Sequence, residues 1–256
     1  MLTIFDIGLY NGADTEYYLE SGYDVVAVEA NPTLVRRAEV RFERYIREGR
    51  LKLLHGAIGP AGDEPVELFL SEDHPGSSSI RSELVASLQP MGSYTVPGIR
   101  FRKLLARHGT PHFVKVDIEG ADRHCILELT QDTCPAFLSF ELGDDCEKLI
   151  GHAESIGFDR FKIINQVVFR ELAEENNIGD RIRRRLVREL GFLNPKSVKR
   201  AGRFFSTGSA GPLPWVSSGS WHSADEALSR WRAVGSLLGR YGLGTTFTPS
   251  AQTESM

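Results

Sequence analysis

The pattern of a strand running into a glycine turn is found in Phe5-Asp6-Ile7-Gly8-Leu9-Tyr10-Asn11-Gly12. Residues 2–7 are mostly apolar and of strand length, so they predict a buried β-strand. The two glycines predict a sharp turn, because glycine tolerates backbone conformations closed to other residues and lets a ligand approach closely. Residues 13–20 predict a helix, which Gly22 would end. The segment therefore indicates the first strand, turn and helix of an α/β fold.

The rest of the first 165 residues repeats this alternation of strands and helices. The next helix has Asn31 as its predicted N-cap and Pro32 at its first position, and its apolar spacing reaches Ile46. Because strand–helix–strand units form right-handed crossovers, we predict a doubly wound, mostly parallel sheet with helices on both faces. The further predicted strands are residues 25–28, 51–54, 112–117, 136–141 and 161–164, and further helices are predicted over residues 121–129 and 145–156.

Two regions interrupt the alternation. Residues 59–110 form an insertion, with one predicted strand at residues 66–70. Beyond about residue 166 the chain carries an arginine-rich helix, a loop rich in Gly, Ser, Pro and Trp, and a last helix opened by the capping box of Ser223 and Glu226. Long structured loops of this kind often cover binding sites, so we expect either region to contribute a lid.

The chemistry of the first turn points to a nucleoside that carries an amino acid. A phosphate-binding turn would read G-x-G-x-x-G, whereas this turn has Asp6 two positions before its first glycine, where a carboxylate would repel a pyrophosphate and attract a cationic or amino group. Glu29 ends the second predicted strand, where an acidic side chain can accept hydrogen bonds from two ribose hydroxyls. Taken separately, these features are also typical of an ordinary glycine turn and of a solvated strand end. Together they predict a site for S-adenosylmethionine.

These segments resemble those of a known family. The chain is similar to class I S-adenosylmethionine-dependent methyltransferases, and more narrowly to the FkbM family, over about residues 2–165. The most specific match is the Lys-x-Asp-x-Glu-Gly-Ala block of residues 115–121. Other family members carry a segment before the first strand, so here we expect residues 59–110 or the tail to cover the cofactor. The remaining matches are residues 5–15, 28–32, 57–59 and 138–141, and Gly208-Ser209-x-Gly211-Pro212 is similar to a segment of some bacterial members.

The resemblance implies a fold and a cofactor site. The fold is the seven-stranded, mostly parallel sheet of class I methyltransferases, with a core in residues 1–170 and a dependent C-terminal cap in residues 171–256. The cofactor is S-adenosylmethionine, with its adenine beside small or apolar side chains. For Ala57 and Ile58, a role in the ordinary core is the alternative. The residues implied to contact the cofactor are Asp6, Gly8, Asn11, Gly12, Thr15, Glu29, Ala57 and Ile58.

Charged side chains gather where the predicted strand at residues 112–117 ends. Strand alternation places Lys115, Asp117 and Glu119 on one side, provided that the chain stays extended. Crowded carboxylates raise one another's pKa and could accept a proton from a substrate hydroxyl or hold a divalent cation such as Mg²⁺. The alternative is a structural Lys–Asp pair with a helix-start glutamate. The predicted catalytic set is Lys115, Asp117, Glu119 and, after the next strand, Glu141; no metal site is predicted.

Composition places the chain among ordinary globular proteins. Its 256 residues are 41% hydrophobic and 25% charged, which excludes a disordered or fibrous chain. The apolar runs are too short to span a bilayer, no signal peptide is recognised and the three cysteines lack metal-like spacing, so we expect a cytoplasmic location. The charge changes sign along the chain: residues 1–150 hold 15 Lys and Arg against 24 Asp and Glu, and the remainder holds 15 against 10.

The methyl acceptor is predicted only as a class. The resemblance implies a hydroxyl of a sugar or natural product, with phosphorylated or carrier-bound acceptors left open. An RNA-modifying enzyme that uses the arginines at residues 181–188 is the alternative. For these arginines we favour a solvated helix that covers the acidic first half, because a sequence pI near 6.0 is unlike a dedicated nucleic-acid binder. A module that binds the cofactor without turnover is a third interpretation. The loop with Trp215 and Trp221 is either a substrate flap or a packed surface loop, and we expect no membrane partner.

Overall fold

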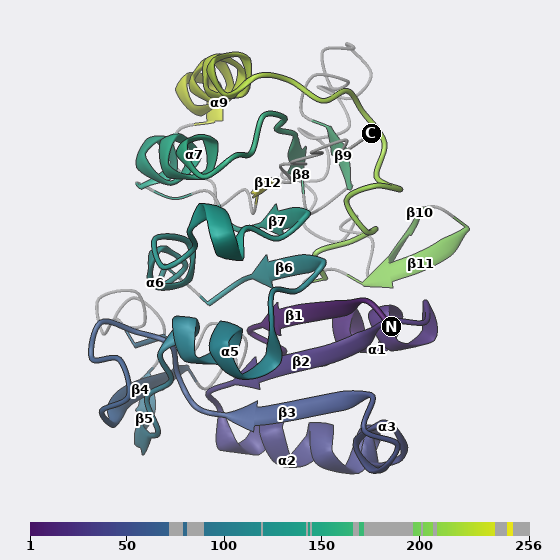
Figure 1. Cartoon of the computed structure of the whole chain (residues 1–256), viewed down its shortest axis with the longest axis vertical. Coiled ribbons are helices and arrows are strands. Elements are labelled where there is room, and N and C mark those ends of the chain that lie inside the picture. Colours follow the sequence, from purple (N-terminus) through teal and green to yellow (C-terminus); the bar gives the residue numbers. More distant parts are fainter. Residues whose placement is uncertain are drawn as a thin grey trace.

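Figure 1 shows the computed structural model of the chain. The structure describes residues 1–71, 79–80, 90–118, 120–141, 143, 145–165, 169–171, 197–200, 202–206, 209–238 and 245–247. Within these ranges, no helix combines the length and apolar character needed to cross a membrane. The arginine-rich segment at residues 181–188 lies outside the described residues, so its interpretation stays a prediction.

The centre of the fold is a sheet of five parallel strands in the order β3-β2-β1-β6-β7, stacked as Figure 1 shows. The strands are β1 (Thr3–Ile7), β2 (Asp24–Glu29), β3 (Leu51–His55), β6 (Phe113–Val116) and β7 (Phe137–Ser139). The strand order reverses at β1, which pairs with β2 on one side and with β6 on the other. Ligands of open α/β sheets bind outside the carboxyl ends of the strands at such a reversal, which places the expected site just past Ile7.

Helices cover both faces of the sheet, as predicted. On one face, α1 and α2 bury Tyr18 and Ala38 in a cluster that includes Ile4 of β1. On the other face, α5, α6 and α7 pack with Phe5, the next residue of β1. This change of face between neighbouring residues follows from strand alternation. The helices are α1 (Ala13–Glu20), α2 (Pro32–Arg41), α3 (Glu43–Arg47), α5 (Phe101–His108), α6 (Arg123–Ile126), α7 (Cys146–Ser155) and α9 (Ala224–Leu238).

Two helices are shorter than the sequence predicted. α2 begins as expected, with Oδ1 of Asn31 accepting a backbone hydrogen bond of the first turn at 2.9 Å. The predicted helix is interrupted at Phe42, which leaves helical geometry and buries its ring next to Gly12, and α3 follows as a separate short helix that includes Ile46. α6 is a single turn, because the N–H groups of Glu128 and Leu129 donate to carbonyl oxygens three positions earlier and so do not continue the α-helix.

Among the described residues the continuous sheet has five strands, so the seven that the resemblance implied are not confirmed. β8 (Ile163–Asn165), the strand predicted at residues 161–164, pairs antiparallel with β9 (Arg170–Glu171) and β12 (Thr245–Phe247) in a separate sheet. β12 contacts β7, but among the described residues no ladder joins them. Both strands have only three residues, so each offers few backbone groups with which to continue the sheet.

The insertion is anchored to the end of β3. It contains the predicted strand as β4 (Val66–Ser71), which pairs antiparallel with β5 (Pro90–Val96). The Ala57 N–H donates to the Pro97 carbonyl at 2.9 Å, and the Ile99 N–H donates to the Ala57 carbonyl at 2.9 Å. The β4–β5 hairpin therefore lies beside a residue that the sequence assigned to the cofactor site.

The described part of the tail packs on both faces of the sheet: Phe205 and Leu213 lie on the same face as α1, whereas α9 packs against α7 on the other face. The Trp215 ring lies 4.6 Å from the Phe137 ring and 5.0 Å from the His112 ring, measured between centroids. Phe137 is the first residue of β7, and His112 directly precedes β6, so Trp215 lies at the amino ends of the strands. Of the two interpretations of this loop, the structure favours a packed surface loop for Trp215, because a flap over the predicted site would lie at the opposite ends of the strands.

Ion pairs join the basic tail to the acidic first half. Arg203 of the β10–β11 hairpin (Ser197–Arg200 and Arg203–Ser206) pairs with Glu20 at the end of α1, and Arg232 of α9 pairs with Glu147 of α7 at 2.8 Å. The predicted capping box at the start of α9 is confirmed by reciprocal bonds between Ser223 and Glu226 at 3.2 and 3.3 Å. At these two places, basic residues of the tail thus pair with acidic residues of the first half.

Candidate functional site

The turn after β1 depends on its two glycines. Gly8 has φ of +90°, and a Cβ there would lie 1.9 Å from the carbonyl oxygen of Asp117. Gly12 has φ of +76° and stands at the N-cap of α1, where a Cβ would lie 2.7 Å from the Phe42 ring. Both positions combine a backbone conformation that favours glycine with a space that admits no side chain. The turn therefore presents bare backbone at the carboxyl end of β1.

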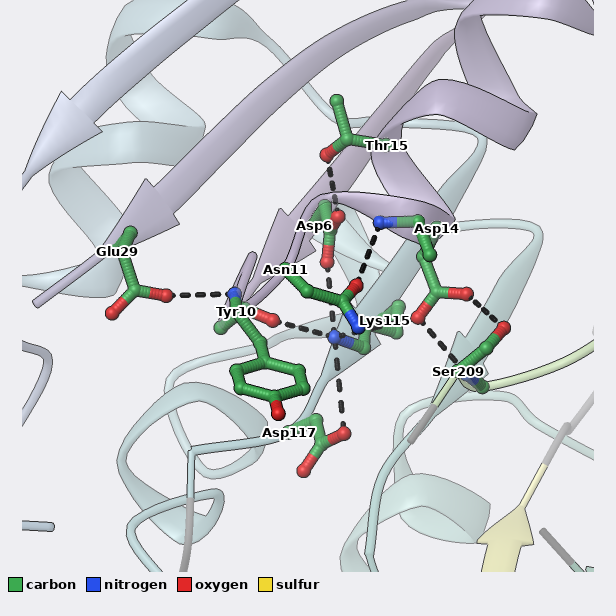
Figure 2. Close-up of polar contacts among 12 residues, drawn as sticks. Asp6, Tyr10, Asn11, Asp14, Thr15, Glu29, Lys115, Asp117 and Ser209 are labelled. Carbon is green, nitrogen blue, oxygen red and sulfur yellow. Dashed lines mark hydrogen bonds and ion pairs between the residues drawn. The ribbon is translucent and has the colours of Figure 1, made fainter. Parts of the chain in front are cut away.

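A buried ion pair lies directly beneath this turn. Asp6 and Lys115 are register partners on β1 and β6, and the Lys115 Nζ lies 3.1 Å from Oδ1 of Asp6. Thr15 donates from its hydroxyl to Oδ2 of Asp6 at 2.6 Å. The Lys115 ammonium also donates to the carbonyl oxygen of Gly8 at 2.6 Å. Lys115 thus ties the strand pair to the backbone of the turn (Figure 2).

Three carboxylates surround the single Lys115 ammonium. Besides Asp6, the Nζ lies 3.9 Å from Oδ2 of Asp14 and 3.8 Å from Oδ2 of Asp117. Burial lowers the Lys115 pKa, but the three negative charges raise it by more, so the ammonium stays charged. Burial raises the pKa of Asp14 to about 6, with Lys115 opposing the rise and Asp6 adding to it. Carboxylates outnumber the ammonium, so the cluster is suited to a cationic ligand.

Glu29 ends β2 with its carboxylate fixed by the backbone. Its Oε2 accepts from the Tyr10 N–H at 2.8 Å, and its Oε1 accepts from the Asn31 N–H at 2.8 Å. The residue is 8% exposed, and burial raises its pKa while these two bonds oppose the rise. Because each carboxylate oxygen offers more than one acceptor position, both oxygens retain capacity for a further donor.

A cavity opens next to Ile58. It has a volume of about 150 Å³, and a cavity of that size can hold a benzene-sized ring. Ile58 and Ala57 are both buried, the former in the core beneath α5 and the latter against the β4–β5 hairpin. The cavity is lined by Ile58, Gly59, Pro60, Gly62, Arg100, Phe101, Arg123, His124, Leu127 and Glu128.

The structure brings most of the predicted site residues to one edge of the sheet. Asn11 is exposed in the turn, where its Oδ1 accepts from the Ala13 N–H at 2.9 Å and so helps to start α1. Glu141 lies two residues beyond β7, at the same edge. Glu119 lies outside the described residues, and its role stays a prediction. The residues that Lys115 joins directly are Asp6, Gly8, Asp14 and Asp117, while Glu29 is joined to the turn through Tyr10.

Sequence reasoning missed two contributors to the cluster. The sequence did not indicate Asp14 as a site residue, because an acidic residue in the first turn of a helix is normally solvated and interacts with the helix dipole. Here it is 5% exposed and points toward Lys115. Ser209 donates from its hydroxyl to Asp14 across 195 positions of sequence. The only signal for it was the short tail segment around Gly208 and Gly211, for which no spatial partner could be named.

A model of the methyltransferase FkbM domain matches residues 6–193, which is well over half of the chain. The chain belongs to the FkbM methyltransferase family. Membership implies S-adenosylmethionine as the cofactor, in agreement with the expectation from Asp6 and Glu29. Among curated proteins, none matches the chain.

Solved structures with a similar chain path include several methyltransferases. An FkbM methyltransferase from Methylobacillus flagellatus is 13% identical with a TM-score of 0.36, covering 55% of this chain and 32% of that one. A TehB-like SAM-dependent methyltransferase from Corynebacterium glutamicum is 11% identical (TM-score 0.33; 64% and 68% covered). A precorrin-6y C5,15-methyltransferase from Geobacter metallireducens is 14% identical (TM-score 0.31; 64% and 69% covered). The chain spans about a third of the Methylobacillus structure, and likenesses this distant add nothing to the family assignment.

A fourth buried carboxyl, Asp122, lies behind the site of this FkbM protein. It is 4% exposed and accepts backbone hydrogen bonds from the N–H groups of Ile118 and Glu141, so it joins the segments that follow β6 and β7. Burial, with repulsion from Asp117, raises its pKa to about 7. Its Oδ1 is buried without a hydrogen-bond partner among the described residues, which suits a neutral carboxyl better than an ionised one. Within the described ranges, no group of three or more His, Cys, Asp or Glu side chains is placed to hold a metal ion.

Asp122→Asn is expected to remove a pH dependence of stability. The folded state keeps the Asp122 proton up to a pKa of about 7, whereas the unfolded chain releases it near 3.8, the ordinary pKa of an aspartate. Stability should therefore fall as pH rises between these values, by at most about 4 kcal/mol at 1.36 kcal/mol per pKa unit. Urea unfolding measures the free energy of unfolding at pH 5 and at pH 8. Between these pH values it should fall less in Asp122→Asn than in wild type, whereas the exposed control Asp132→Asn should behave as wild type does. Identical slopes in all three proteins would contradict the assignment.

Proposed function

We propose that this protein binds S-adenosylmethionine at the carboxyl ends of β1, β2 and β3 and transfers its methyl group to a hydroxyl oxygen of a sugar or natural-product small molecule. The observation that carries the cofactor assignment is the Glu29 carboxylate. Two backbone N–H groups hold it in one orientation, and each oxygen keeps an acceptor position for a ribose hydroxyl. The orientation is thus set before the cofactor arrives, which lowers the entropic cost of binding.

Three further features fit the rest of the cofactor. Gly8, whose lack of a side chain lets the turn pack against the Asp117 carbonyl, lies at the carboxyl end of β1, and there we place the methionine end. The surplus of carboxylates around Lys115 attracts the positive sulfonium and ammonium groups. The cavity beside Ile58, which has Phe101 and Leu127 in its wall, is where we place the adenine ring. Three of the predicted contact residues have a supporting role in this proposal and need not touch the cofactor. Asn11 and Gly12 form the turn, and Thr15 donates to the carboxylate of Asp6.

The chain's own residues have a limited chemical task. When bound, S-adenosylmethionine supplies a methyl group that is already activated by the positive sulfur. The protein must hold the acceptor oxygen in line with the methyl–sulfur bond, and such positioning can provide much of the rate enhancement. It must also accept the proton that the hydroxyl loses as its oxygen gains the methyl group. A carboxylate at the carboxyl end of a strand can do this.

Asp117 is the carboxylate that we propose for proton transfer. Its side chain is 31% exposed, whereas those of Asp6 and Asp14 are at most 6% exposed, so of these three it is the one that an acceptor can reach. Lys115 is 3% exposed with a raised pKa, and we assign it the positioning of Asp117 and Gly8 in place of proton transfer. Glu119 and Glu141 remain candidates for contact with the acceptor, and residues 171–256 remain the proposed cap.

Glu29→Ala is expected to weaken binding of S-adenosylmethionine by about 10- to 100-fold, the usual effect of losing hydrogen bonds to a charged group. Titration calorimetry measures the dissociation constant. The matched control is Glu39→Ala, which removes an exposed glutamate of the neighbouring helix α2 and should bind as wild type does. Wild-type protein that is folded and does not bind the cofactor would reject the assignment, and equal affinity of the two variants would reject the role of Glu29.

A further inference from the structure

The tail residues 209–211 contact the charged cluster around Lys115, which lies beneath the turn of residues 8–12. The Ser209 hydroxyl donates to Oδ1 of Asp14, and the Ala210 N–H donates to Oδ2 of the same carboxylate at 2.9 Å. The Gly211 N–H in turn donates to the Ser209 hydroxyl oxygen at 3.0 Å, which fixes the rotamer of that hydroxyl. Each oxygen of Asp14 thus has its own donor from residues 209–210. Figure 2 shows Ser209 meeting Asp14 on the side away from Glu29.

The position of this tripeptide is set independently of Asp14. Gly211 has φ of +86°, and a Cβ there would lie 2.3 Å from the Phe169 ring. Two residues later, Leu213 is buried in the core cluster that also contains Phe169 and Phe205. Ser209 itself is 3% exposed. The tail is therefore packed in place on both sides of the contact, and its two donors are held ready for the carboxylate.

Asp14 connects this contact to the turn. Its Oδ2 lies 3.9 Å from the Lys115 Nζ, and the same ammonium donates to the Gly8 carbonyl oxygen at 2.6 Å. The match to the family model ends at residue 193, so both donors to Asp14 come from beyond the matched residues. We propose that Ser209 is a positioning residue of the cofactor site. It keeps Asp14 charged, so that Asp14 contributes to the cluster that attracts the cationic cofactor. This proposal rests on the proposed function.

The charges around Asp14 give this proposal a specific consequence. The groups near Asp14 come from several elements. They are Asp6 of β1, Lys115 of β6, Asp117 just after β6 and farther away, Tyr18 of α1 and Ser209 of the tail. Burial raises its pKa to about 6, and the bonds from Ser209 and Ala210 oppose that rise. Removal of the hydroxyl moves the pKa upward, so a larger fraction of Asp14 is protonated at pH 7 and the cluster loses negative charge.

Ser209→Ala is the test, with two ligands compared by calorimetry. S-Adenosylmethionine carries one more positive charge than S-adenosylhomocysteine, its thioether product, and is otherwise closely similar. We expect Ser209→Ala to weaken binding of the cationic ligand at pH 7 by up to about 10-fold, the limit set by complete loss of one charge at several ångströms, and to weaken binding of the thioether less. At pH 8.5, where a larger fraction of Asp14 is ionised in the variant, the difference should shrink.

The control is Ser217→Ala, in the same tail. The Ser217 hydroxyl accepts from Lys162 at 3.2 Å and donates to the Pro214 carbonyl at 2.7 Å, away from the cluster, so this variant should keep the ligand preference of wild type. If Ser209→Ala fails to fold, Asp14→Asn removes the same charge and should lose the same preference. An equal loss for both ligands, or no loss, would overturn the inference while wild-type binding sustains the proposed function. A wild type that binds neither ligand would overturn both.

Discussion

Lys115→Met is expected to lower the free energy of unfolding by about 3–5 kcal/mol, the usual cost of leaving buried charges without their partner. The Lys115 Nζ is within 4 Å of carboxylates of Asp6, Asp14 and Asp117, and the first two are almost completely buried. Without the ammonium these carboxylates repel one another in a poorly solvated place. Denaturant unfolding measures the change, and the unfolding midpoint should be far below that of wild type at pH 8.

The destabilisation should also depend on pH. Asp14 already has a pKa near 6 with Lys115 present, and loss of the ammonium raises it further, so the variant takes up protons and recovers stability as pH falls from 8 to 5. The matched control is Lys103→Met, which breaks an exposed ion pair with Asp63 and should change little. If Lys115→Met is too unstable to purify, adding Asp14→Asn removes one of the stranded charges and should restore folded protein. A Lys115→Met protein as stable as wild type would contradict this account of the cluster.

The local parts of the fold were predictable from sequence because local rules determine them. The first strand, its glycine turn and the cap at Asn31 follow from residue types at short spacing, and the structure confirms each of them. The end of α2 was not predictable, because it depends on the Phe42 ring filling the space beside Gly12. A contact of that kind joins two segments whose distance in space the sequence does not specify.

The same distinction applies to the candidate site. Asp6 and Glu29 could be selected because the ends of neighbouring strands meet at one edge of a parallel sheet. That Lys115 is the centre of a buried cluster required the register between β1 and β6, which pairs it with Asp6. The role of Ser209 required knowledge of where the tail packs, and no rule of spacing relates it to Asp14. Sequence reasoning therefore selected the side chains that we propose to face the cofactor better than those that hold them in place.

The largest effect on activity is expected for Asp117→Asn. Turnover should fall by about 10²- to 10⁴-fold, the range for loss of a general base, because asparagine keeps the shape of the side chain but cannot take the hydroxyl proton. Affinity for S-adenosylmethionine should change far less than turnover, since Asp117 is the most exposed of the three carboxylates around Lys115 and the ribose is assigned to Glu29. The rate is measured as formation of S-adenosylhomocysteine with a panel of hydroxylated sugars and natural products.

A matched control separates proton transfer from loss of charge. Asp24 is 35% exposed, close to the 31% of Asp117, and its carboxylate lies 3.5 Å from Arg50, but it stands at the amino end of β2. Asp24→Asn should therefore keep the wild-type rate. An unchanged rate in Asp117→Asn would reject Asp117 as the base and leave Glu119 and Glu141 as candidates. A fall in cofactor affinity equal to the fall in rate would assign Asp117 to cofactor binding alone.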